Sequence, residues 1–174
     1  VIVGEKINPT GKKKMQKELL AGKFSAVRSL VKEQENHKSD ALDVNMGVPG
    51  ADEKKLMRKA ISILAVASDL PLVVDSSDPE VLESALRLYP GKALINSISG
   101  EKTRLKKLLP LAKKYGAMFI LLPLDSKKIP LPFKERKVII KKMVETAKEE
   151  GFTKDDIVVD ALVMTLSCYP RAAI

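Results

Sequence analysis

The feature that most constrains this chain is a regular alternation of short apolar segments with segments of helical periodicity. Six apolar runs of strand length recur, and each leads into a stretch whose apolar residues return every three or four positions or into the start of one. The expected strands are 1–5, 41–45, 70–76, 92–97, 117–125 and 156–162. A repeated strand–helix unit of this kind predicts a parallel sheet covered by helices.

Two α/β architectures contain such a unit. An open doubly wound sheet that binds a dinucleotide carries G-x-G-x-x-G after its first strand, and this chain has no such motif there. A (β/α)₈ barrel usually needs about 250 residues, whereas this chain has 174. If the chain forms a barrel, we therefore expect one domain over residues 1–174 that covers six strand–helix units and lacks the C-terminal ones.

Composition excludes several classes of protein. The net charge of +9 suggests nucleic-acid binding, but the lysines alternate with glutamates on helical surfaces and aromatic residues make up only 4%. We interpret this charge as a solvated helix surface that attracts small anions. The longest apolar runs are too short to cross a bilayer. The single cysteine, Cys168, fits a reducing compartment, so we expect a cytoplasmic protein. The start lacks an initiator Met and a signal-peptide pattern, and we interpret it as the edge of a domain.

Polar side chains follow every expected strand. Asp75 is the clearest example, because Asp78 and Pro79 already supply the cap and first turn of the next helix, so Asp75 is not needed there. In a βα barrel the carboxyl ends of all strands meet at one mouth, where active sites lie. The strand-end residues are Glu5, Asn8, Asp43, Asn45, Asp75, Asn96, Ser97, Asp125 and Asp160.

The chemistry of this set suggests its ligand. It contains neither His nor Cys, which argues against nucleophilic catalysis and against a transition-metal site, and we predict no bound metal. Several carboxylates could hold Mg²⁺, but asparagines are interleaved with them. Carboxylates accept hydrogen bonds, and carboxamides both donate and accept. Such a mixture suits a flat heterocycle that carries N–H groups and a carbonyl, as the edge of a pterin does.

Five segments carry a more specific resemblance. They are GEKINPTG, LDVNMG, VVDSSDPEVLESALRLYPGKALINSISGE, PLAKKYGAMFILLPLD and DIVVDALVMT. In this order they resemble the pterin-binding domain of cobalamin-dependent methyltransferases, which includes the folate domain of methionine synthase and the methyltetrahydrofolate:corrinoid/iron–sulfur protein methyltransferase. The resemblance covers essentially the whole chain. It implies a dihydropteroate synthase-like (β/α)₈ barrel.

The resemblance also implies an activity and its partners. The family moves a methyl group from methyltetrahydrofolate to Co(I) of a corrinoid, so a cobalamin-binding domain or a separate corrinoid protein is expected as partner. A homodimer is compatible with this expectation, whereas nucleic acid and membranes are not expected partners. When the methyl group leaves, nitrogen 5 of the pterin must gain a proton or a strong hydrogen bond, because an amine anion is a poor leaving group.

Site residues follow from the matching motifs. Asp75, Asn96 and Asp160 are expected to hydrogen-bond the pterin, and Asp75 and Asp160 to act in catalysis by tuning the basicity of the ring. The residues expected to line or support the pocket are Asn8, Asp43, Asn45 and Ser97. The chain departs from the family at Ala161 and at Ser39-Asp40, and it lacks the strand-seven segment that carries an asparagine near the reacting nitrogen.

Three alternatives remain at this point. Dihydropteroate synthase shares the fold, and INSISG resembles its fourth-strand motif, but a TPDSF stretch after the first strand is missing. A non-catalytic folate-binding fragment is consistent with the absent strands. Nucleic-acid binding rests on net charge alone, and a salt-dependent shift with DNA or RNA would support it.

Overall fold

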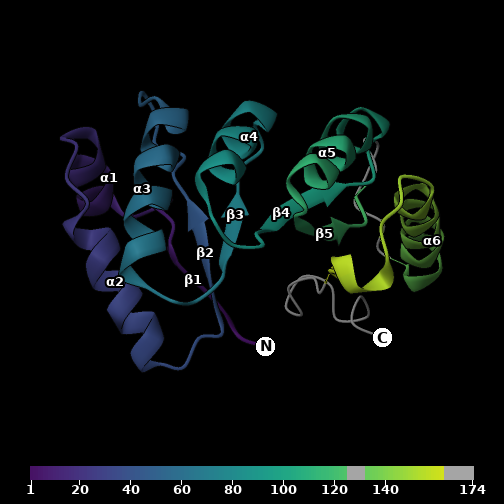
Figure 1. The fold of residues 1–174 in the computed structure, drawn as a ribbon, viewed down its shortest axis with the longest axis horizontal. Coiled ribbons are helices and arrows are strands. Elements are labelled where there is room, and N and C mark those ends of the chain that lie inside the picture. Colours follow the sequence, from purple (N-terminus) through teal and green to yellow (C-terminus); the bar gives the residue numbers. More distant parts are fainter. Residues whose placement is uncertain (125–131, 163–174) are drawn as a thin grey trace. The chain divides into compact units, whose positions relative to one another are not determined.

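The computed structural model describes residues 1–124 and 132–162 of the chain (Figure 1). The chain divides into two compact units, Val1–Asn96 and Ser97–Ile174, which are considered separately. Each described strand is paired in parallel with a neighbour, and helices alternate with the strands, as the sequence predicts. Whether residues 1–174 act as one domain stays a prediction.

The first unit contains four parallel strands in the order of the sequence, from β1 to β4. Asp75 on β3 lies in register with Asn45 on β2 and with Asn96 on β4, so these three residues are level. β2 and β3 end there, whereas β4 continues to Ser99 and does not end at Asn96 and Ser97 as predicted. The elements are β1 (Val3–Ile7), α1 (Lys13–Leu20), α2 (Ser25–Asn36), β2 (Ala41–Asn45), α3 (Glu53–Ala67), β3 (Leu72–Asp75), α4 (Pro79–Leu88) and β4 (Leu94–Ser99), which extends past the unit boundary.

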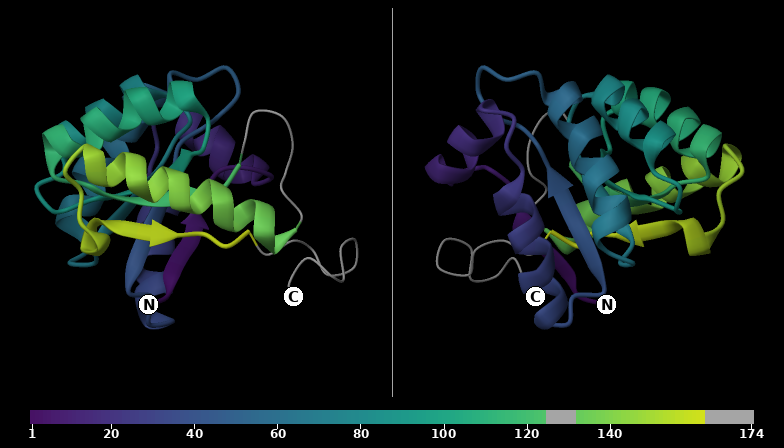
Figure 2. Two further views of the ribbon diagram at one scale, coloured as in Figure 1. Left: turned by 90° about the vertical axis from the view of Figure 1, so that its right-hand side faces the viewer. Right: turned by 60° about the vertical axis from the view of Figure 1, so that its left-hand side comes forward.

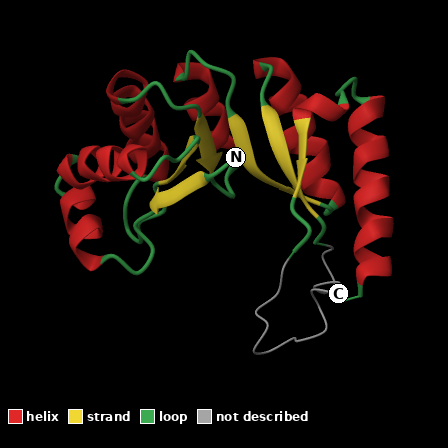
Figure 3. Cartoon of the chain, turned by 90° about the horizontal axis from the view of Figure 1, so that it is seen from below, coloured by secondary structure: helices red, strands yellow, loops and turns green. Residues whose placement is uncertain are grey.

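The helices of this unit lie on one face of its strands (Figures 2 and 3). Successive side chains of a strand point to opposite faces. On β2, Leu42 and Val44 are fully buried apolar residues, whereas Asp43 and Asn45 take the alternate positions. Leu72 and Val74 on β3 follow the same pattern. On β2 the alternation therefore places apolar side chains under the helices and polar side chains on the opposite face. On β3 the buried Val73 alternates with Leu72 and Val74, so that opposite face is only partly polar.

The first strand differs from its predicted range. The apolar run predicted a strand over residues 1–5, but β1 extends to Ile7. Gly4 pairs with Leu42 and Ile7 with Val44, so β1 uses one more residue than β2 and contains a bulge. Glu5 lies in this irregular stretch and is exposed, so it does not end the strand as predicted. The pattern of apolar residues in a sequence does not indicate where a bulge forms.

Helix starts in the first unit follow the predicted cap chemistry. The Asp78 carboxylate accepts a hydrogen bond from the Glu80 N–H at 2.8 Å, and Pro79 occupies the first turn of α4. Asp52 caps α3 in the same way through the Lys55 N–H at 2.9 Å. The prediction that Asp78 is a helix cap is therefore confirmed.

The second unit contains α5 (Lys102–Tyr115), β5 (Met118–Leu122), α6 (Phe133–Glu149), a 3₁₀ turn (Lys154–Asp156) and β6 (Ile157–Val159). β5 and β6 pair in parallel, and Phe119 packs edge-on against Phe152 with ring centroids 4.9 Å apart. α5 continues through Pro110, and the predicted kink there stays a prediction. Helix α6 is followed by Gly151 at φ +89°, which agrees with the predicted glycine end.

None of the described helices combines the length and the apolar character that crossing a bilayer requires. Asp125, one of the predicted strand-end residues, lies outside the described residues, as does Cys168.

Candidate functional site

Strands β2, β3 and β4 bring four of the predicted site residues together. The Asn45 amide donates a hydrogen bond to Asp75 Oδ2 at 2.9 Å, and the Asn96 amide donates to Asp43 Oδ1 at 3.0 Å. We call Asp43, Asn45, Asp75 and Asn96 the strand-end row. Each carboxylate in the row is thus paired with one carboxamide donor.

Asp43 is the deepest member of the strand-end row. Asp43 is only 3% exposed. Asn96 is its one hydrogen-bond partner among the described residues. Burial raises the pKa of Asp43 from 3.8 to about 6, the hydrogen bond from Asn96 opposes this rise, and the nearby charges of Asp75 and Glu5 add to it. Asp43 therefore titrates close to neutral pH, unlike an ordinary surface aspartate.

The row leaves hydrogen-bond acceptors available to a ligand. Asn45 Oδ1 accepts from the Gly47 N–H at 2.9 Å, which fixes the orientation of this amide and directs its N–H₂ group toward Asp75. Asp75 uses Oδ2 for that bond, and Asn96 uses its amide nitrogen for Asp43. Asp75 Oδ1 and Asn96 Oδ1 have no partner within residues 1–124 and 132–162. The free groups at half-buried Asp75 and Asn96 are therefore acceptors, which match N–H donors on a ligand.

Three other predicted residues make contacts close to them in the sequence or within their own unit. Asn8 Oδ1 accepts from the Thr10 N–H at 2.9 Å, so its side chain holds the turn after β1. Asp160, in the second unit, accepts from the Leu162 N–H at 2.8 Å, and its own N–H donates to the Leu121 carbonyl. The Ser97 carbonyl accepts from Arg104 at 3.5 Å. Each of these contacts is local to its own unit.

Sequence reasoning missed one buried link next to the row. The Ser76 hydroxyl donates to Glu53 Oε1 at 2.6 Å and accepts from the Asp78 N–H at 3.1 Å. Ser76 is buried, and these bonds connect the end of β3 to the first turns of α3 and α4. A serine directly after a strand carries no distinctive sequence signal, so this role was not predictable.

The described residues contain no group of three or more His, Cys, Asp or Glu side chains suited to holding a metal ion. The alternation of carboxylate and carboxamide instead resembles the lining of a site for a planar, hydrogen-bonding ring. This is the chemistry expected of a pterin pocket.

Comparison with known proteins identifies the family. The family described as pterin binding enzyme matches residues 4–170. The chain belongs to the pterin-binding enzyme family. The resemblance drawn from the sequence segments is thereby confirmed.

The curated relatives include a methylcorrinoid:tetrahydrofolate methyltransferase and methionine synthases. The methylcorrinoid:tetrahydrofolate methyltransferase of Eubacterium limosum is 31% identical over 170 residues, covering 96% of this chain and 62% of that protein. The methionine synthase of Mycobacterium tuberculosis is 24% identical over 173 residues, covering 96% of this chain and 14% of that protein. The chain thus spans less than two thirds of either relative.

Solved structures with the same fold include dihydropteroate synthases. The enzyme from Stenotrophomonas maltophilia superposes with a TM-score of 0.69 at 18% identity, over 97% of this chain and 63% of that one. The enzyme from Xanthomonas albilineans in complex with 7,8-dihydropteroate gives a TM-score of 0.66 at 17% identity, over 91% and 58% respectively. At these identities the likeness establishes the fold, which is the α/β barrel type predicted, and not the reaction.

Proposed function

We propose that this chain binds the pterin ring of a reduced folate and takes part in methyl transfer between that folate and a corrinoid carried by a partner protein or domain. The observation that carries the proposal is the strand-end row, in which Asp75 and Asn96 present free acceptors beside a buried Asp43. The names of the Eubacterium and Mycobacterium relatives support methyl transfer over pterin condensation.

The reaction places a defined demand on the protein. As the methyl group moves from nitrogen 5 of the folate to cobalt, that nitrogen keeps the bonding electron pair and must gain a proton. The free Asp75 oxygen would accept from the N–H groups of the pterin edge and hold the ring. Asn96 Oδ1 would accept a second N–H, which fixes the ring orientation. Fixed placement of the reacting atoms contributes a large part of the rate of a two-substrate reaction.

Asn45 and Asp43 would act through their neighbours. Asn45 donates to Asp75 and so keeps one carboxylate oxygen engaged and the other directed to the ligand. Asp43 accepts from the Asn96 amide, so the Asn96 oxygen stays available for the ligand. The predicted roles of Asp160, Ser97 and Asn8 stay predictions from family resemblance.

Calorimetry tests ligand binding separately from the reaction. We expect 5-methyltetrahydrofolate to bind and a purine that lacks the amino-and-carbonyl edge of a pterin, such as adenosine, to bind far more weakly. Methyl transfer is then measured from the absorbance of methylcobalamin formed from cob(I)alamin. Equal binding of folate and purine would refute the pterin site, whereas folate binding without methyl transfer would refute the reaction only.

A further inference from the structure

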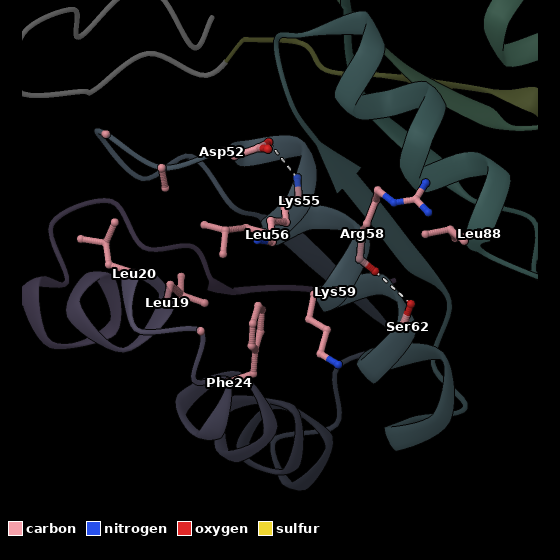
Figure 4. Close-up of a pocket in the computed structure, with 13 residues that line it drawn as sticks. Leu19, Leu20, Phe24, Asp52, Lys55, Leu56, Arg58, Lys59, Ser62 and Leu88 are labelled. Carbon is pink, nitrogen blue, oxygen red and sulfur yellow. Dashed lines mark hydrogen bonds between the residues drawn. The ribbon is translucent and has the colours of Figure 1, made fainter.

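A hollow lies in the first unit on the helical face, and none of the strand-end row lines it. It is bordered by the end of α1, the segment leading into α2, and α3, with Leu88 of α4 at one side (Figure 4). Its volume is about 660 Å³, within the range of roughly 300–1,000 Å³ typical of binding sites. We call it the α1–α3 hollow. The lining residues used below are Leu19, Leu20, Phe24, Lys55, Leu56, Arg58, Lys59 and Leu88.

The floor of the α1–α3 hollow is apolar. Leu19, Phe24 and Leu56 are buried and form its base, while Leu20 and Leu88 are 56% and 37% exposed at its sides. Large apolar side chains that gather around a concavity mark an interaction site more often than scattered ones do. This concavity was not predictable from the sequence, because Leu20 and Leu88 have the spacing of core residues but lie at helix ends.

The rim on α3 is cationic. Lys55, Arg58 and Lys59 have the i, i+3, i+4 spacing that places side chains on one helical face, and all three are exposed. Within the described ranges none of them forms an ion pair, whereas the adjacent Lys54 pairs with Glu80 at 3.0 Å. The one carboxylate in the lining, Asp52, is engaged as the cap of α3. The rim therefore keeps its positive charge for an occupant.

The distribution of these cations indicates the form of the occupant. Lys55 and Lys59 are four residues apart on α3, which is a rise of about 6 Å along the helix axis. A row of three cations along one helical face can pair with several carboxylates at once. Glutamates four positions apart on a second helix have the same rise, and the apolar face of that helix would cover Leu20 and Leu88. A helix placed in an apolar groove is a common mode of recognition.

We infer that the α1–α3 hollow binds an acidic amphipathic helix presented by a partner protein. The apolar side chains of that helix pack on Leu19, Phe24 and Leu56, and its carboxylates face Lys55, Arg58 and Lys59. The inference goes beyond the proposed function, because none of these residues belongs to the strand-end row. Peptide binding to the hollow can therefore be tested independently of folate binding.

The test uses the full chain and a synthetic helical peptide of about 15 residues. The peptide carries leucines at i, i+3, i+4 and i+7 on one face and glutamates beside them, and its affinity is measured by fluorescence anisotropy. We expect saturable binding that weakens with added salt. The double change Lys55→Glu and Lys59→Glu should weaken binding roughly tenfold or more. Leu20→Asn should weaken it too, with little effect on folding because Leu20 is exposed.

The controls separate the hollow from general positive charge. Lys32→Glu makes the same charge change on an exposed part of α2 outside the hollow and should leave peptide affinity unchanged. A peptide with lysines in place of glutamates should not bind. The inference is overturned if both peptides bind alike, if Lys32→Glu weakens binding as much as the double variant, or if decanoate binds the hollow and the acidic peptide does not. Self-association of the chain through Leu20 and Leu88, detected by light scattering and abolished by Leu20→Asn, would overturn it as well.

Discussion

The aspartates of the strand-end row have different hydrogen-bond partners from the aspartates that start α3 and α4. Asp43 and Asp75 accept hydrogen bonds from asparagine side chains on other strands. Asp52 and Asp78 accept from backbone N–H groups a few residues along their own segment. The first arrangement depends on the tertiary fold and leaves free acceptors, whereas the second satisfies a helix end and nothing more.

The largest expected effect comes from replacing Asp75, which tests whether the strand-end aspartates differ from the cap aspartates in binding a ligand. Asp75→Asn keeps an oxygen that can accept from Asn45, but it turns the other acceptor into an N–H₂ group facing ligand donors. We expect affinity for 5-methyltetrahydrofolate to fall roughly 10- to 100-fold, with a small change in thermal stability. Calorimetry and a melting curve measure the two. Unchanged affinity would place Asp75 outside the pterin site.

Asp43 offers a second test of the comparison, through the pH dependence of the free energy of unfolding. Its pKa in the folded chain is about 6, above the unfolded value of 3.8, so the folded state binds more protons between these two pH values. The contribution of Asp43 to stability is therefore full below about pH 4 and is lost as the pH rises through 6. The shift corresponds to a loss on the order of 1–3 kcal/mol in the free energy of unfolding.

Urea unfolding of the parent chain and of Asp43→Asn at pH 4.5 and 7.5 measures this loss. The parent should lose more stability than the variant between the two pH values, because the variant has no proton to release. Asp69→Asn, at an exposed carboxylate between α3 and β3, serves as the matched control and should behave as the parent does. Equal pH dependence in parent and Asp43→Asn would mean that Asp43 keeps an ordinary pKa.

The smallest expected effect concerns the helix cap. Asp78→Ala should lower the free energy of unfolding by roughly 0.5–2 kcal/mol and leave folate affinity nearly unchanged in the folded fraction. Asp78→Asn should restore most of the stability, because asparagine also caps helices well. Chemical denaturation together with calorimetry checks both variants. A loss of folate affinity in Asp78→Ala would erase the distinction between the strand-end row and the caps.

Much of this fold was predictable from local patterns. The run at 41–45 is a strand with the predicted bounds, and the Asp78-Pro79 start of α4 was expected from cap chemistry. The bulge in β1 was not predictable, because it depends on register against β2. The strand-end residues were predicted as a group, but their pairing was not. That Asn96 bonds Asp43 and that Asn45 bonds Asp75 follows from how the strands align in space.

The Asn96–Asp43 hydrogen bond has a consequence for curvature. These residues come from β4 and β2, which are both neighbours of β3 and not of each other. Adjacent strands lie about 4.8 Å apart, so the backbones of β2 and β4 would be nearly 10 Å apart in a flat sheet. Two short side chains standing upright on such a sheet would not meet. A bond of 3.0 Å between them means that the strands bend toward the polar face, and Asn96→Ala would release this tie across the concave side.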